Sequence, residues 1–151
     1  MNVTSKKTLS SILCAALIAA TALCAAGCSN SKTTTPPPQD ATYSASATPH
    51  ALGEGETTFP LSVIDLNGQE VRFEISTNAD TVGEALTEVG LIAGEYGPYG
   101  LMVTTVNGLT LVYETDHAYW AFYIDGDYAM TGVDSTDIVN GQSYGLKAEK
   151  A

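Results

Sequence analysis

The sequence predicts an α+β domain in which a small mixed sheet packs on one helix, in an arrangement similar to a β-grasp. Three observations support this class: two Asn-Gly pairs between short apolar-rich stretches, one segment of helical periodicity between them, and an aromatic strand further on. Asn-Gly between alternating stretches is a strong hairpin signal, because both residues tolerate the positive φ of a two-residue turn. The predicted order of elements is ββαβββ, with a further strand at the C-terminal end.

The first hairpin is predicted where "FPLSVIDL" and "QEVRFEIS" flank Asn67 and Gly68. A helix follows it in "DTVGEALTEVGLI", in which Thr81 and Glu84 have the spacing of a capping box. The apolar residues of the next turns recur on one helical face, and Gly90 stands where a helix end is expected. One short helix is therefore expected directly after the hairpin.

The C-terminal half is predicted to form the remaining strands. The glycine-rich "AGEYGPYG" over residues 93–100 is expected to be a loop, although it carries two tyrosines. "LMVTTV" and "LTLVY" flank the second Asn-Gly and predict another hairpin. In "YWAFYIDGDYAM", a strand would place Trp120, Phe122 and Ile124 on one face and the tyrosines on the other. The last strand is expected in "QSYGLKAE".

Residues 1–27 are predicted to be a signal peptide, because two lysines precede an apolar run over residues 12–26. This run is shorter than the roughly 20 residues that a membrane-spanning helix needs. The ending "AAGC" resembles a bacterial lipobox, which implies that Cys28 carries lipid and becomes the new N-terminus. Cys14 and Cys24 would leave with the signal, so Cys28 would have no partner for an internal disulfide. The alternative is ordinary cleavage near Ala26, without lipid.

Residues 28–56 are predicted to be a disordered tether, and residues 57–151 the folded domain. The tether is rich in Ser, Thr and Pro and has almost no large apolar side chains with which to offset its ordering entropy. We therefore expect it to be dispensable for folding. The protein is expected to be extracytoplasmic and anchored to the cell membrane through the lipid, with the domain standing off the bilayer.

The predicted domain is strongly acidic. From Asp65 to Glu149 it has fourteen acidic residues, and from Thr57 to Ala151 it has only three basic ones. Without a basic patch, nucleic acid and anionic lipid surfaces are poor partners. The acidity serves solubility in the simplest interpretation, and attraction of a cationic partner in a second one.

The aromatic residues allow two interpretations. Trp120 and Phe122 have the spacing of core residues, and burial of an aromatic ring stabilises a domain by several kcal/mol, at about 25 cal/mol per Å². The tyrosines of the glycine-rich loop, together with Tyr128 and Met130 after a glycine turn, occupy no position that requires burial. Apolar rings with a few polar groups are typical of small-molecule sites.

Four stretches in matching order resemble the C-terminal domain of transcobalamin and intrinsic factor, and the bacterial surface proteins that carry such a domain. They are "TVGEAL", "YGPYGLMVTTVNG", "YWAFYIDGDYAMTGVD" and "NGQSYGL", and they extend from Thr81 to Leu146. The resemblance implies a domain that caps one face of cobalamin or a related corrinoid, with the ligand bound by the "YGPYG" loop and the region after the Trp strand. The expected contacts are Tyr96, Gly97, Pro98, Tyr99, Trp120, Phe122, Tyr128 and Met130.

The vertebrate proteins clasp the ligand between this domain and a large helical domain, and these 151 residues hold no such domain. We therefore expect weak binding or a partner that completes the site. The expected function is to bind the corrinoid and to assist its uptake by handing it to a membrane transporter. The expected partners are therefore a corrinoid transporter or a second surface protein. The alternative is a structural or adhesive module on the same fold, with aromatic residues in its core and no corrinoid.

Other chemistry is not indicated. His117 lies in the polar "ETDHA" and is expected to be solvated rather than a metal ligand. The aspartates at residues 125, 127, 134 and 137 lack the spacing and closing glutamate of an EF-hand and predict an acidic, turn-rich surface. No phosphate loop, Gly-x-Ser-x-Gly motif or catalytic cysteine is found. We expect a binding protein that is not an enzyme and has no prosthetic group.

Overall fold

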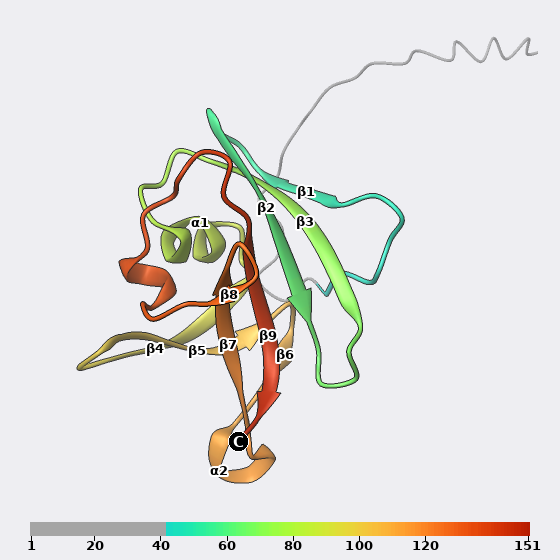
Figure 1. The fold of residues 1–151 in the computed structure, drawn as a ribbon, viewed down its shortest axis with the longest axis vertical. Coiled ribbons are helices and arrows are strands. Elements are labelled where there is room, and N and C mark those ends of the chain that lie inside the picture. Colours follow the sequence, from blue (N-terminus) through green and yellow to red (C-terminus); the bar gives the residue numbers. More distant parts are fainter. Residues whose placement is uncertain (1–41) are drawn as a thin grey trace, which may run out of the picture. The chain divides into compact units, whose positions relative to one another are not determined.

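The computed structural model describes residues 42–151, which form two sheets around one helix of more than a single turn (Figure 1). The predicted α+β class is confirmed. Among the described residues, no helix has the length and apolar character needed to cross a membrane. The strands are β1 (His50–Gly53), β2 (Thr57–Ile64), β3 (Glu70–Thr77), β4 (Ile92–Gly97), β5 (Gly100–Val106), β6 (Leu109–Thr110), β7 (Ala118–Ile124), β8 (Asp127–Tyr128) and β9 (Tyr144–Lys150). The helical segments are α1 (Val82–Glu88), α2 (Tyr113–Asp116) and the 3₁₀ turn η1 (Val133–Ser135).

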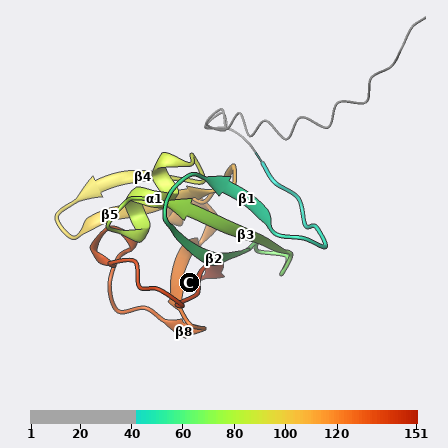
Figure 2. The same ribbon diagram turned by 90° about the horizontal axis from the view of Figure 1, so that it is seen from above.

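The larger sheet is mixed and has the order β1-β3-β2-β9-β7-β8, whereas β4, β5 and β6 form a separate sheet (Figures 1 and 2). The last strand, β9, is inserted between strands from the two halves of the chain. It runs parallel to β2 and antiparallel to β7. The core lies on the inner face of this sheet, where the apolar residues of β2, β3, β7 and β9 meet helix α1.

Two polar turns that the sequence predicts as alike prove to differ. Asn107 and Gly108 both have positive φ, +48° and +75°, and connect β5 to β6 as the Asn-Gly prediction requires. The first turn is wider, because the Asp65 carboxylate accepts hydrogen bonds from the main-chain N–H groups of Gln69 and Asn67, both at 2.8 Å. These bonds hold the pKa of Asp65 below its usual value, with the bond from Gln69 contributing most.

Helix α1 begins and ends as the sequence predicts. The Thr81 hydroxyl accepts a hydrogen bond from the main-chain N–H of Glu84 at 3.3 Å. At the other end Gly90 has a φ of +66°, and the N–H of Leu91 donates to the carbonyl of Leu86 at 2.9 Å. This is the Schellman arrangement, which satisfies carbonyls that the helix end would otherwise leave unpaired. The helix contacts β3, β4 and η1.

The domain begins earlier than the predicted boundary at residue 57. Strand β1, in a segment predicted to be tether, pairs in parallel with β3, and Leu52 is buried in the core. Further upstream, the main chain of Tyr43 exchanges two hydrogen bonds with the side chain of buried Asn107, at 2.7 and 2.8 Å. Residues 42–56 thus contact the domain instead of forming a separate tether, and we expect their removal to destabilise the fold. The signal peptide, Cys28 and the rest of the tether lie outside the described residues.

We predict that Leu52→Ala lowers the free energy of unfolding by about 2 kcal/mol or more, because it removes a buried side chain. Ala51→Ser is the control, since Ala51 is exposed on the same strand, and should change the value by less than about 0.5 kcal/mol. Urea unfolding of the full chain measures both. Equal midpoints for Leu52→Ala and the parent protein would show that β1 does not belong to the cooperative domain.

Candidate functional site

The two central rings of the predicted ligand site lie in the core. Trp120 and Phe122 are each only 8% exposed and belong to the buried cluster inside the larger sheet. The Phe122 ring lies nearly parallel to that of Tyr144, with centroids 6.1 Å apart. Both rings are therefore almost wholly covered by the protein, which agrees with the core interpretation of these residues, and their contact with a ligand stays a prediction.

The predicted glycine-rich loop is instead the end of a hairpin. Strands β4 and β5 pair up to Gly97 and Gly100, so only Pro98 and Tyr99 form the turn. Tyr99 is 99% exposed and Tyr96 is 77% exposed. Proline presets the φ of the first turn position, and Gly100 supplies a φ of +101° that a larger residue would adopt only with strain. The hairpin thus carries one exposed tyrosine, Tyr99, at its turn and a second, Tyr96, close by on β4.

The hairpin is tied to the segment after β8 through Asp134. The main-chain N–H of Leu101 donates to Asp134 Oδ2 at 3.1 Å. A Cβ on Gly100 would lie 2.5 Å from the same oxygen, so glycine is also needed for this close approach. Met130, which is 93% exposed, lies on the segment that Asp134 holds against the hairpin.

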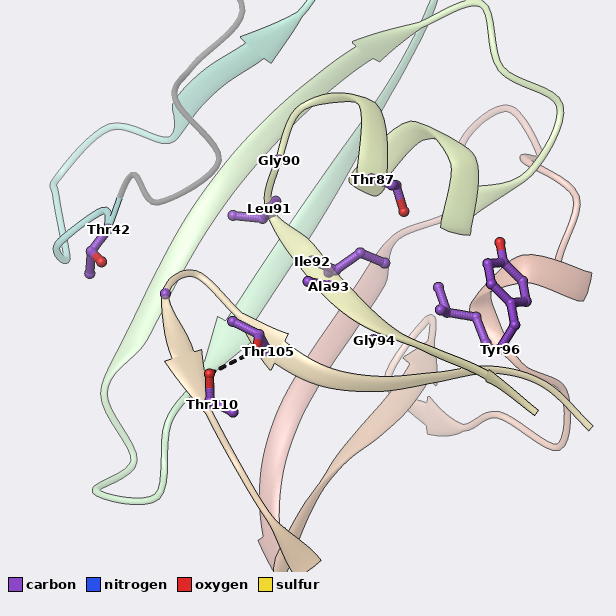
Figure 3. A pocket seen from close by; sticks show the side chains of 12 residues that line it. Thr42, Thr87, Gly90, Leu91, Ile92, Ala93, Gly94, Tyr96, Thr105 and Thr110 are labelled. Carbon is purple, nitrogen blue, oxygen red and sulfur yellow. Dashed lines mark hydrogen bonds between the residues drawn. The ribbon is translucent and has the colours of Figure 1, made fainter.

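A groove of about 500 Å³ lies between α1 and one face of the β4–β5–β6 sheet (Figure 3). Tyr96, which is paired with Leu101 across the hairpin, lies toward one end, and Thr87 of α1 faces the same space. Toward the other end the hydroxyls of Thr105 and Thr110 share a hydrogen bond of 2.8 Å. The groove is lined by Thr42, Thr87, Gly90, Leu91, Ile92, Ala93, Gly94, Tyr96, Leu101, Thr105, Gly108 and Thr110. It therefore combines a tyrosine ring with several hydroxyl groups.

The opposite face of the hairpin also exposes an apolar side chain. Met102 is 62% exposed and is paired with Glu95, so its side chain lies on the face away from Tyr96. Exposed apolar side chains that gather on one element are more informative than scattered ones, since they indicate a contact surface. We name Tyr96, Gly97, Pro98, Tyr99 and Met102 the hairpin surface.

Tyr128 does not join the hairpin surface. It is paired with Tyr123 across β7 and β8, and the two rings meet edge to face with centroids 5.7 Å apart. Figures 1 and 2 show β8 well apart from the hairpin tip. The predicted contact residues thus divide among the hairpin, the core and the outer side of the larger sheet.

The remaining polar residues have structural partners or lie in turns. His117 is the left-handed residue that ends α2, with a φ of +47°. Asp125 Oδ1 accepts hydrogen bonds from the main chain and the hydroxyl of Ser143, at 2.8 and 3.1 Å. Within residues 42–151, no three His, Cys, Asp or Glu side chains come together as metal ligands. The acidic turns therefore organise the backbone in the described part of the chain.

Comparison with known proteins gives a family match and two solved structures. Residues 79–147 match the family described as a domain of unknown function, DUF4430. A candidate metal-binding protein from Ruminococcus gnavus ATCC 29149 is 30% identical with a TM-score of 0.60, over 64% of this chain and 99% of that one. Haptocorrin in complex with Cbi is 16% identical with a TM-score of 0.48, over 65% of this chain and 26% of that one. No curated protein sequence matches the chain.

We predict that the core and surface aromatic residues separate in stability measurements. Trp120→Ala should lower the free energy of unfolding by about 3–5 kcal/mol, because it leaves a cavity in the core. Tyr99→Ala should change it by less than about 0.5 kcal/mol, because the ring is exposed to solvent. Chemical denaturation of the full chain provides the measurement. A large loss for Tyr99→Ala would mean that the hairpin tip is packed and not a free surface.

Proposed function

The chain belongs to the same family as the Ruminococcus gnavus protein, and we propose that its domain is a binding module for a flat organic ligand, cobalamin or a related corrinoid. The observation that carries the proposal is the hairpin surface, where Tyr96 lines a groove of about 500 Å³ and Tyr99 is fully exposed at the turn that follows β4. A tyrosine side chain has only two torsions, so an exposed tyrosine ring loses little conformational freedom when a ligand covers it.

The chemistry of the hairpin surface suits a broad, flat ligand with polar arms. A planar ring system can lie against the tyrosine side chains and remove their apolar surface from water. The hydroxyl groups of Thr87, Thr105 and Thr110 line the adjoining groove and can bond amide arms of the ligand. The four stretches from Thr81 to Leu146 that resemble transcobalamin-type domains support the same ligand class, and they include this hairpin.

The described residues favour an organic ligand over a free metal ion. The Ruminococcus gnavus protein is described as a candidate metal-binding protein. In the present chain, residues 42–151 bring no group of three metal-ligating side chains together. The hairpin surface offers aromatic and thioether side chains instead, which are weak ligands for hard cations.

A second protein would complete the site. The hairpin can cover only one face of a flat ligand, so the other face stays open to solvent or to a partner. We propose that a corrinoid transporter or a second surface protein covers it, with the domain held outside the cell by lipid on Cys28. The alternative function is a non-enzymatic structural or adhesive module in which the hairpin surface contacts another protein.

Titration of the full chain with cobalamin tests the ligand class. Trp120 is the only tryptophan, and a corrinoid absorbs where tryptophan emits, so binding should quench its emission saturably after inner-filter correction. Tyr99→Ala and Tyr96→Ala should each weaken binding about tenfold, or ~1.4 kcal/mol, through loss of ring contact. Tyr113→Ala removes an exposed tyrosine on α2, outside both the β4–β5 hairpin and the groove, and should have no effect. Absence of binding up to about millimolar concentration, which means weaker than about −4 kcal/mol, would favour the structural or adhesive module.

The anchor is tested separately. We predict that the full chain fractionates with membranes and that Cys28→Ala moves it to the soluble fraction or leaves it unprocessed, because no thiol remains to be lipidated. Cys24→Ala is the matched control, since that residue lies within the predicted signal and should not alter partition. Identical partition of the Cys28→Ala protein and the parent into the soluble fraction would contradict the lipid anchor.

A further inference from the structure

A row of side chains crosses the outer face of the larger sheet, away from the hairpin surface. Strand pairing places Arg72 opposite Ser62, Ser62 opposite Gly145, Gly145 opposite Tyr123, and Tyr123 opposite Tyr128. Directly opposed residues in neighbouring strands project to the same face of a sheet. The row therefore runs from a guanidinium, over two small residues, to a pair of tyrosine rings.

The two small residues form the floor of a furrow. A hollow of about 190 Å³ is lined by Arg72, Ser62, Gly145 and Tyr123, among others. A second hollow, of about 290 Å³, shares the last three of these residues and extends to Lys147. Since neighbouring strands lie about 4.8 Å apart, the backbones of Arg72 and Tyr123 are about 14 Å apart. This leaves room for one six-membered ring between their side chains, and we name the space the Arg72–Tyr123 furrow.

The tyrosine wall of the furrow is held in place. The Tyr123 hydroxyl donates to Glu149 Oε1 at 2.7 Å, and Lys147 Nζ forms an ion pair with the same oxygen at 2.9 Å. The pKa of Glu149 is lowered, first by the bond from Lys147 and then by that from Tyr123, so the carboxylate stays ionised. Glu149 and Lys147 are thus paired with each other, and the bond from the Tyr123 hydroxyl to Glu149 holds the tyrosine ring in place at this side of the furrow.

Arg72, by contrast, has no partner among the described residues. The ion pair between Lys147 and Glu149 is the only one within residues 42–151, a range that holds three basic residues, Arg72, Lys147 and Lys150, among many more acidic ones. Glu70 and Glu74 share the outer face of β3 with Arg72 and form no ion pair with it. A guanidinium recognises a carboxylate through two parallel hydrogen bonds, so an anionic group is the complementary ligand.

The Ser62 hydroxyl adds a second unused polar group. No hydrogen bond to it is formed within the described part of the chain, and it lies half-buried in the floor beside Gly145. A ligand that reaches Arg72 with a carboxylate would pass directly over this hydroxyl. A ring that itself carries hydroxyl groups can bond it, whereas an aromatic ring without them cannot.

We infer that the Arg72–Tyr123 furrow binds a sugar ring that carries a carboxylate, such as a uronic acid residue of an acidic saccharide. Arg72 takes the carboxylate, Ser62 bonds a ring hydroxyl, and the sugar ring lies over Gly145 with its C–H groups against Tyr123. The site differs from the hairpin surface in position and in chemistry, and it needs no corrinoid.

Titration of the ¹⁵N-labelled full chain with D-glucuronate, followed in amide spectra, tests the inference. The amides of Ser62, Gly145 and Tyr123 should shift saturably, while those of the hairpin surface should stay unchanged. Arg72→Gln should weaken binding about tenfold or more, since it removes the charge-assisted bonds. Lys150→Gln makes the same charge change on an exposed residue outside the row and should leave binding intact.

A second variant and two further ligands complete the test. Gly145→Ala adds a methyl group 3.3 Å from Ser62 Oγ and fills the floor, so it should also weaken binding. D-Glucose, which lacks the carboxylate, should bind at least about tenfold more weakly than glucuronate. If benzoate shifts the same amides at equal or lower concentration, the ligand is not a saccharide. If Arg72→Gln, with an unchanged melting temperature, binds glucuronate as the parent does, the assignment of the site is wrong.

Discussion

The pairing of β9 with β2 is the interaction on which the rest of the domain depends. It joins the C-terminal strand to the first hairpin in parallel, with Leu61 opposite Tyr144 and Val63 opposite Leu146. Tyr144 then packs edge to face on Phe59, with centroids 5.1 Å apart, and so links the two halves of the core. Strand β7 joins the larger sheet through β9, so without the β9–β2 pairing β7 and its aromatic residues would be separated from the first hairpin.

The same register determines what each face of the sheet can do. A slip of one residue would turn Gly145 inward and Tyr144 outward, because side chains alternate with a period of two. The core would lose a large ring and the outer furrow would lose its floor. On β7, the alternation that buries Trp120 also places Tyr123 outside. Core and furrow are therefore two consequences of one alignment, and the apolar face fixes that alignment.

Much of the fold could be predicted from local sequence. The Thr81 cap, the Gly90 stop and the second Asn-Gly turn each follow from a residue and its near neighbours. Strand β1 could not be predicted, because "HALG" is too short for a pattern and its order depends on β3 and on the contact of Tyr43 with Asn107, 64 positions apart. Long-range contacts also decide which aromatic residues are buried in the core and which are exposed, so local sequence could not predict this either.

The aromatic residues of the candidate site illustrate this difference. Period-two alternation correctly places Trp120 and Phe122 on the same face of β7. Only the packing of other elements on that face shows that it is buried in the core. Tyr96 and Tyr99, in a segment that lacks an alternating apolar pattern, are free because the glycines beside them let β4 and β5 close a tight turn away from the core. The hairpin is then fixed through Asp134 and not through its own rings. Substitutions at the hairpin tip can therefore alter the ligand surface without altering the core, because the core depends on the register of β2, β9 and β7.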